Sequence, residues 1–442
     1  MAEENANLEK KLGPWMLWGL GVGYVISGMY FGWNLGLEKG GTYGMAIATF
    51  FVIIMYITFT FSYAELAVSI PKAGGAFDYA RLAFGERLGF VAGFSQAIEF
   101  VFAPPAIAYA IGAYIHTFLP SVSVLSIAIV VYFLFTALNI YGVKTAASFE
   151  LVITIFAVIE LLVFAFVCLP EFEMSNLQKN PLPHGYSGVF AALPFAIWFF
   201  LAIEGVANVA EETINPQKNI LIGFGSAIAS LVFLAILTFI AAVGVSGWED
   251  IVFEKPGSLP SDSPLPLALG KVVGKSHFLY HMLVSIGLFG LLASFHGIIL
   301  AAGRATYELG KENFAPPFLG LIHSRFHTPA RALLVNMIFG ILALFTGKTA
   351  EIITLACFGA LSLYITSCLS LLQLRKQKPE LERPFQVPFY PYFPFIALSI
   401  AIVSLLAMVY YNVFLFIIYL MIHLFFYSLY RYFSTRKANE NT

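Results

Sequence analysis

Long apolar segments separated by short polar loops run through almost the whole chain. Most of these segments reach the roughly 20 residues that an α-helix needs to cross the hydrocarbon core of a bilayer. The pattern predicts an all-α polytopic membrane protein with twelve transmembrane helices, at residues 15–37, 43–66, 88–118, 122–141, 146–169, 187–209, 221–246, 277–309, 331–347, 351–374, 392–411 and 413–432.

The composition agrees with a membrane protein. Hydrophobic residues make up 59% of the 442 residues and charged residues 11%, and the mean hydropathy is +0.83, whereas about a quarter of the residues in soluble domains are charged. The expected surroundings are therefore a lipid bilayer, and a net charge of −1 gives no reason to expect a nucleic-acid partner. The odd number of cysteines, all in apolar stretches, predicts core residues, without a disulfide, metal or cofactor.

Two of the apolar segments contain residues that favour unwinding. The first carries the glycine-rich stretches 19–23 and Ile26–Gly32, and the sixth carries Trp198–Gly205. Inside a bilayer, an interrupted helix is tolerated only where its free backbone groups line a cavity enclosed by protein. Interruptions at corresponding positions of two halves are typical of secondary transporters with inverted repeats. The pattern predicts such a transporter, with its substrate site between the two breaks.

The charges of the loops predict the orientation. When the loops are assigned alternately to two sides, eighteen of the 24 Lys and Arg residues fall on one side. Cytoplasmic loops carry an excess of Lys and Arg. We therefore predict a protein of the plasma (inner) membrane with both termini in the cytoplasm, residues 1–12 and 434–442 forming the tails.

Three carboxyl groups are predicted at mid-membrane depth, where no Lys or Arg occurs: those of Glu99, Glu160 and Glu204. A buried carboxylate is costly, so each needs a partner or a function. Glu204, at the sixth-span break, either meets a substrate ammonium, carries a coupling proton or caps free N–H groups of the broken helix. Glu99 either contacts the substrate or acts as a hydrogen-bonding strut beside the helix-kinking Pro104 and Pro105. This acidic site favours a cationic or zwitterionic small amine over an anion.

Further residues suggest how transport is coupled and gated. Glu160 is predicted to serve as a neutral hydrogen-bond donor, as a proton carrier, or as part of a cation site with Ser294, so the coupling ion is H⁺ or Na⁺. His296 either takes up a proton or is a core residue. Trp198 and Phe200 either close over a substrate ammonium by cation–π attraction or simply pack in the core.

Several loop sequences resemble those of the amino acid–polyamine–organocation (APC) transporters in order and spacing, over about residues 12–390. They are Pro71–Ala80, Ala210–Lys218, Arg304–Pro316 and Arg383–Pro388, together with Ile26–Gly28. The resemblance implies a LeuT-like fold with two inverted five-span repeats, at 13–170 and 187–375, two additional spans at 390–433, and helices 1 and 6 broken at mid-membrane. It also implies that the breaks, including Ala202, line the substrate site.

A closer resemblance is to the ethanolamine-permease branch, through Val25–Asn34, Phe61–Leu66 and Ile98–Ala108. The chain departs from that branch at Met29, where such proteins have an acidic residue. In amino-acid-binding relatives, the N–H groups at Ser27 and Gly28 form a cradle for a carboxylate. Both an ethanolamine-like amine and a small zwitterionic amino acid therefore remain candidate substrates.

The same residues also bear on three other functional classes: enzyme, sensor and exchanger. No aspartate lies in a predicted span, and no constellation of catalytic groups is apparent, so an enzyme is not expected. A membrane nutrient sensor of the same fold is an alternative to a transporter, because binding and transport would use one site. Within the transporters, an exchanger is an alternative to an ion-coupled symporter.

Overall fold

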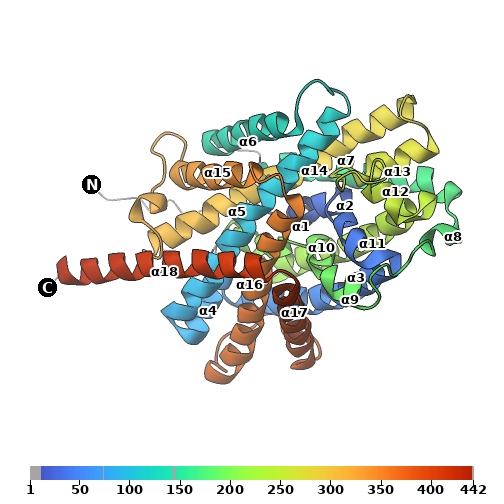
Figure 1. Ribbon diagram of the computed structural model, residues 1–442. Coiled ribbons are helices and arrows are strands. Elements are labelled where there is room, and N and C mark those ends of the chain that lie inside the picture. Colours follow the sequence, from blue (N-terminus) through green and yellow to red (C-terminus); the bar gives the residue numbers. More distant parts are fainter. Residues whose placement is uncertain (1–10, 73, 143–145, 441–442) are drawn as a thin grey trace.

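The computed structural model describes residues 11–72, 74–142 and 146–440, so most of the predicted tail 1–12 lies outside the described residues. The described chain is a bundle of helices (Figure 1). The α-helices are α1 Pro14–Val25, α2 Ser27–Tyr30, α3 Asn34–Ser69, α4 Ala76–Phe84, α5 Glu86–His116, α6 Val124–Tyr141, α7 Ala146–Cys168, α8 Met174–Leu177, α9 Ser187–Ala191, α10 Leu193–Trp198, α11 Pro216–Ser246, α12 Trp248–Val252, α13 Pro264–Val272, α14 Phe278–Lys311, α15 Ala330–Leu344, α16 Thr349–Gln377, α17 Tyr392–Tyr411 and α18 Val413–Glu440. Three 3₁₀ helices are η1 Leu169–Glu171, η2 Ile203–Glu212 and η3 Pro317–Gly320.

Nine helices in the described parts of the chain are long and apolar enough to cross a membrane. The other three predicted spans coincide with the shorter helix α15 and with the two interrupted segments, residues 14–40 and 187–212. The first predicted span ends inside α3, where Gly41 has φ 65° and ψ −173° and kinks the helix. A side chain at this position would also clash with Pro183, so both the backbone conformation and the lack of space require glycine.

Helix α5 lies in the middle of the bundle and packs against α4, α14 and α16 (Figure 1). Helix α1 packs against α7 and α11. Helix α18 runs along the outside (Figure 1), and very little of its apolar part, Val413–Arg431, is buried. The breaks therefore lie among central helices, while the described side chains of the last helix are mostly free to contact lipid.

A buried carboxylate ties the end of α3 to the end of α16. Glu65 is 1% exposed and accepts two hydrogen bonds of 2.7 Å from the Arg375 guanidinium. It also accepts a 2.7 Å hydrogen bond from the Val387 backbone N–H, and Arg383 Nε lies 3.4 Å away. The Arg375 guanidinium stacks over the Tyr390 ring at 4.3 Å. We call these residues the Glu65 clamp; it brings together two of the sequence motifs, Phe61–Leu66 and Arg383–Pro388.

Candidate functional site

The first break consists of one short helical turn followed by extended backbone. Helix α1 ends at Val25, and Ser27–Tyr30 form a single helical turn. The backbone then becomes extended at Phe31 (φ −161°, ψ 174°) and enters the left-handed region at Gly32 (φ 88°). The strongest unwinding thus lies at Phe31–Gly32, beyond the Ser27–Gly28 cradle that the sequence suggested.

The sixth-span break lies between α10, which ends at Trp198, and η2, which begins at Ile203. Ala202 has φ 76° and ψ 10°, a left-handed conformation that is unfavourable for a residue with a Cβ. Its backbone N–H donates a 3.2 Å hydrogen bond to Glu99 Oε1 on α5. Glu99 therefore caps the Ala202 N–H, while the Glu204 carboxyl lies within hydrogen-bonding reach of its own backbone N–H.

The two breaks pack directly against each other. A Cβ at Gly28 would lie 2.5 Å from the Trp198 carbonyl oxygen, so only glycine allows this approach. The Trp33 ring stacks on the Phe199 ring, with centroids 5.6 Å apart, and Phe31 meets the Trp198 ring edge-on at 5.4 Å. The predicted substrate residues are all buried, with exposures of at most 3%: Ile26, Ser27, Met29, Glu99, Trp198, Phe200, Ala202 and Glu204. The site is thus closed to solvent in this conformation.

Glu99 and Glu204 form a carboxyl pair at the sixth-span break. Their side chains are within hydrogen-bonding reach of each other, and both are fully buried. Glu204 Oε2 also accepts a 3.2 Å hydrogen bond from the Tyr364 hydroxyl, which lies 3.0 Å from the Tyr56 hydroxyl. Glu99 Oε2 and Glu204 Oε1 have no hydrogen-bond partner among the described residues. Two adjacent buried carboxylates repel unless a proton or a cation lies between them, so this pair is suited to bind an ammonium or a proton.

Ser294 of α14 joins the two sides of the turn at Ile26. Its hydroxyl donates a 2.6 Å hydrogen bond to the Gly23 carbonyl and accepts a 2.9 Å bond from the Ser27 N–H. Ser294 therefore satisfies backbone groups that the interrupted helix leaves free. The structure places this predicted coupling residue directly at the first break.

Glu160 of α7 has different neighbours from Ser294. It is 4% exposed and lies within hydrogen-bonding reach of Tyr30 at the end of α2. The Tyr30 hydroxyl donates to the Ala157 carbonyl at 2.9 Å, and the Tyr30 carbonyl accepts from the Tyr114 hydroxyl at 3.1 Å. Glu160 thus contacts the first break through an aromatic side chain.

A second acid on α7, which sequence reasoning missed, faces the first break. Glu150 Oε2 lies 3.5 Å from His296 Nδ1, with side-chain exposures of 2% and 5%. Neither Glu150 carboxyl oxygen, nor His296 Nδ1, has a hydrogen-bond partner among the described residues. A Cβ at Gly23 would lie 2.5 Å from Glu150 Oε1, so the pair lies against the backbone of α1. Glu150 and His296 can hold one proton between them.

A loop before α13 covers the first break. Asn34 donates a 2.8 Å hydrogen bond to the Ser261 carbonyl and accepts a 3.0 Å bond from the Gly32 N–H. The next residue, Asp262, accepts a 3.0 Å hydrogen bond from the Thr349 hydroxyl at the start of α16. Desolvation raises the pKa of Asp262 to about 6, and the Thr349 hydrogen bond opposes that shift. The side-chain amide of Asn34 thus joins the covering loop at Ser261 to the unwound backbone at Gly32.

Comparison with known proteins identifies the family. The family model described as "Amino acid permease" matches residues 12–431. The chain belongs to the amino acid permease family. A permease of this family is an integral membrane transport protein and not an enzyme.

In the described ranges, no three His, Cys, Asp or Glu side chains are grouped so that they could hold a metal ion.

Three relatives align with the permease over most of its length. An uncharacterised transporter of Rhizobium meliloti is 26% identical and covers 88% of this chain and 84% of its own. The methylthioribose transporter of Bacillus subtilis is also 26% identical, with coverages of 90% and 88%. The branched-chain amino acid permease of Bacillus subtilis is 24% identical, with coverages of 96% and 93%. These relatives support membrane transport of small molecules.

Proposed function

We propose that the permease is a secondary active transporter that carries a small zwitterionic amino acid or an ethanolamine-like amine by alternating access. The observation that carries the proposal is the Glu99–Glu204 carboxyl pair, buried at the sixth-span break, with the first break packed against the same segment. Twelve spans in a LeuT-like 5+5 inverted repeat, in the plasma membrane with cytoplasmic termini, are part of this proposal. The names of the relatives support the amino-acid class.

In this proposal the substrate ammonium separates the two carboxyl groups and bonds to both. Opening of the contact between Gly28 and the Trp198 carbonyl creates the space for the substrate. The Gly28 N–H then receives a carboxylate, if the substrate has one, whereas the Ser27 N–H is already bonded to the Ser294 hydroxyl. Trp198 and Phe200 close over the bound molecule; the Trp198 Nε1 donor lacks a partner among the described residues and is available to it.

Counterflow in proteoliposomes tests the function directly. Vesicles containing the purified permease are loaded with an unlabelled amino acid or ethanolamine, and uptake of the labelled compound is followed. A thermal-stability screen of the purified protein with amines and amino acids first selects the ligand, because a bound ligand raises the unfolding temperature. Stabilisation without counterflow would favour a sensor, and neither response to any amine or amino acid would refute the proposed substrate class.

The orientation can be tested by labelling. We expect a cysteine at Lys218, just after the start of α11, to be accessible only from the cytoplasm, and one at Ser261 only from outside. The reason is the concentration of Lys and Arg on one side of the membrane. An impermeant thiol reagent applied to intact cells should label Ser261→Cys and not Lys218→Cys, while permeabilised cells should show both. Labelling of Lys218→Cys in intact cells would reverse the topology.

Met29 offers a test of the substrate class. If its side chain faces the bound substrate, Met29→Glu should favour ethanolamine over zwitterionic amino acids, because the new charge attracts an ammonium and repels a neighbouring carboxylate. One such contact corresponds to about 1–3 kcal/mol, or a change of roughly five- to 150-fold in the preference between the two classes. Met29→Gln, which adds a similar side chain without charge, is the control. An unchanged ratio in Met29→Glu would show that this side chain does not contact the substrate.

We propose H⁺ as the coupling ion and the Glu150–His296 pair as its site. Glu150→Gln should then abolish substrate uptake driven by a pH gradient and leave counterflow, which needs no net proton movement, within about twofold of the native rate. Glu160→Gln serves as the comparison, since that acid lies at the other end of the first break. If Glu150→Gln leaves gradient-driven uptake intact while Glu160→Gln abolishes it, the coupling site is Glu160; if a Na⁺ gradient drives uptake, the proposed ion is wrong.

A further inference from the structure

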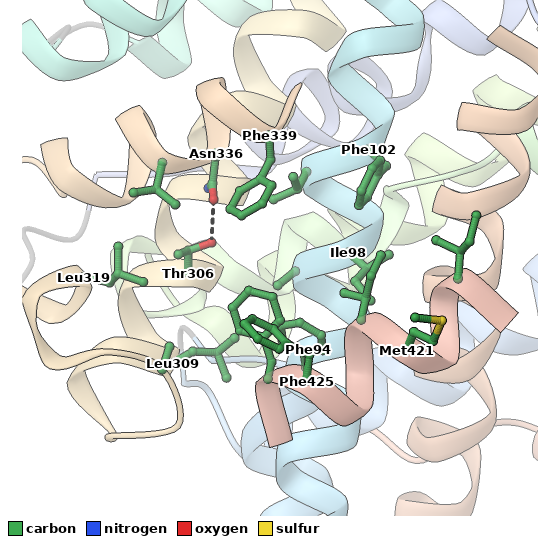
Figure 2. Close-up of a pocket in the computed structure, with 17 residues that line it drawn as sticks. Phe94, Ile98, Phe102, Thr306, Leu309, Leu319, Asn336, Phe339, Met421 and Phe425 are labelled. Carbon is green, nitrogen blue, oxygen red and sulfur yellow. Dashed lines mark hydrogen bonds between the residues drawn. The ribbon is translucent and has the colours of Figure 1, made fainter. Parts of the chain in front are cut away.

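An elongated apolar groove lies on the outside of the bundle, between α5, α14, α15 and α18 (Figure 2). Its volume is about 480 Å³. The lining residues of α5 and of α18 follow the same spacing, i, i+3, i+4, i+7 and i+8, so each set occupies one helix face. The two sets are Phe94, Ala97, Ile98, Val101 and Phe102 on α5, and Ile418, Met421, Ile422, Phe425 and Phe426 on α18. Eight residues of helix give the groove a length of about 12 Å.

One wall of the groove belongs to α18, which is long and apolar enough to cross a membrane. On α18, Met421 and Phe425 are 62% and 60% exposed, and this helix is the least buried of the long apolar helices in the described chain. An apolar surface at membrane depth is covered by lipid chains and not by water. No charged residue lines the groove. A free amine or amino acid would therefore find no counter-charge in it, and the occupant must come from the membrane.

One polar group in the wall lacks a partner. The Thr306 hydroxyl of α14 donates a 3.1 Å hydrogen bond to Asn336 Oδ1 of α15, and both side chains line the groove (Figure 2). Asn336 is 7% exposed, and its Nδ2 donates no hydrogen bond to any described residue. An unmet donor next to hydrocarbon is costly. Asn336 also lines a small inner cavity together with Thr136, whose hydroxyl has no partner among the described residues either. A ligand of the groove that carries an acceptor beside a long apolar chain would satisfy the Asn336 donor.

We propose that the groove binds an acyl chain of a membrane glycerolipid, with the ester carbonyl accepting a hydrogen bond from Asn336 Nδ2. The chain lies along the facing surfaces of α5 and α18. Phe94 and Phe426, whose ring centroids are 4.8 Å apart, pack at the point where these two helices meet. The bound lipid contacts α5 and α14, which carry Glu99 and Ser294 at the breaks. This site is separate from the proposed substrate site and does not depend on it.

Photo-crosslinking in lipid nanodiscs tests the position of the site. The probe is a phosphatidylcholine that carries a diazirine on one acyl chain, and the adducts are mapped by mass spectrometry. We expect adducts to concentrate on residues 94–102 and 418–426. Met421→Trp, which fills the groove with a large ring, should lower them at least about fivefold, the loss expected when overpacking excludes a ligand. Leu424→Trp, at a 65% exposed position of α18 outside the groove, is the matched control and should leave them unchanged.

Competition between two unlabelled lipids tests the hydrogen bond. A diester phosphatidylcholine and its diether analogue differ in the carbonyl that Asn336 would contact. The native permease should prefer the diester by roughly three- to tenfold, the range of one neutral hydrogen bond. In Asn336→Leu this preference should disappear while both lipids still compete.

Three results would overturn the proposal. Adducts spread evenly over all lipid-facing helices would mean that the groove holds only bulk lipid. Crosslinks between two copies of the chain across α18 would mean that the groove is an interface. Equal competition by the two lipids in the native protein would remove the role of Asn336. None of these results bears on substrate transport.

Discussion

Glu65→Gln is expected to destabilise the permease more than any other single change considered. The substitution removes the charge that two arginines share in the Glu65 clamp and leaves the Arg375 guanidinium, with a side-chain exposure of 18%, without its counter-charge. Removing one partner of a buried ion pair costs about 3–5 kcal/mol. The thermal unfolding temperature of the purified protein should fall steeply, and its expression with it.

Glu351→Gln is the control for the clamp. Glu351 also pairs with a basic residue, Lys348 at 2.7 Å, but its side chain is 45% exposed. Exposed pairs of this kind contribute about 0–1 kcal/mol, so this variant should unfold close to the native temperature. Equal unfolding temperatures for the two variants would show that Glu65 is no more important than a surface ion pair.

Glu204→Gln is expected to weaken substrate binding by roughly tenfold or more, since one charge-assisted hydrogen bond contributes about 1.5–3 kcal/mol. Folding and surface level should change little, because the N–H of the left-handed Ala202 is bonded to Glu99, which the substitution leaves intact. The introduced amide oxygen can still accept the hydrogen bond from the Tyr364 hydroxyl. Any loss of affinity therefore reports the removal of the negative charge.

Two comparisons make this result interpretable. Tyr364→Phe removes the hydroxyl without changing the charge of the pair and should have a smaller effect, within about fivefold, as expected for one hydrogen bond. Binding to the purified protein is measured together with uptake, so that a folding defect is not read as a binding defect. Native affinity in Glu204→Gln would remove Glu204 from the substrate site.

The positions of the helices follow from the sequence because uninterrupted apolar runs dictate where a chain can cross hydrocarbon. The segment 392–411 has the predicted bounds, and the predicted limits of the first two spans fall on either side of the kink at Gly41. The residues at which the first span unwinds could not be predicted from the apolar runs. Glycines mark where a helix can open, whereas the position at Phe31–Gly32 depends on contacts with the sixth-span break.

The chemistry of the site was predicted only in part. Glu204 and Glu99 stood out because they interrupt apolar runs, but that they face each other follows from the packing of α5 against the sixth-span break. Glu150 gave a weaker signal, because it lies one turn from the start of its predicted span, where charges are common. Its partner His296 is far away in sequence, and only the fold brings the two together.

The two hydrogen bonds of Asn34 have a kinetic consequence. A single side chain bonds to the covering loop at Ser261 and to the unwound backbone at Gly32, so displacing one partner changes the orientation of the amide that serves the other. We therefore expect movement of the loop at Ser261 and reshaping of the unwound backbone at Gly32 to be coupled in time.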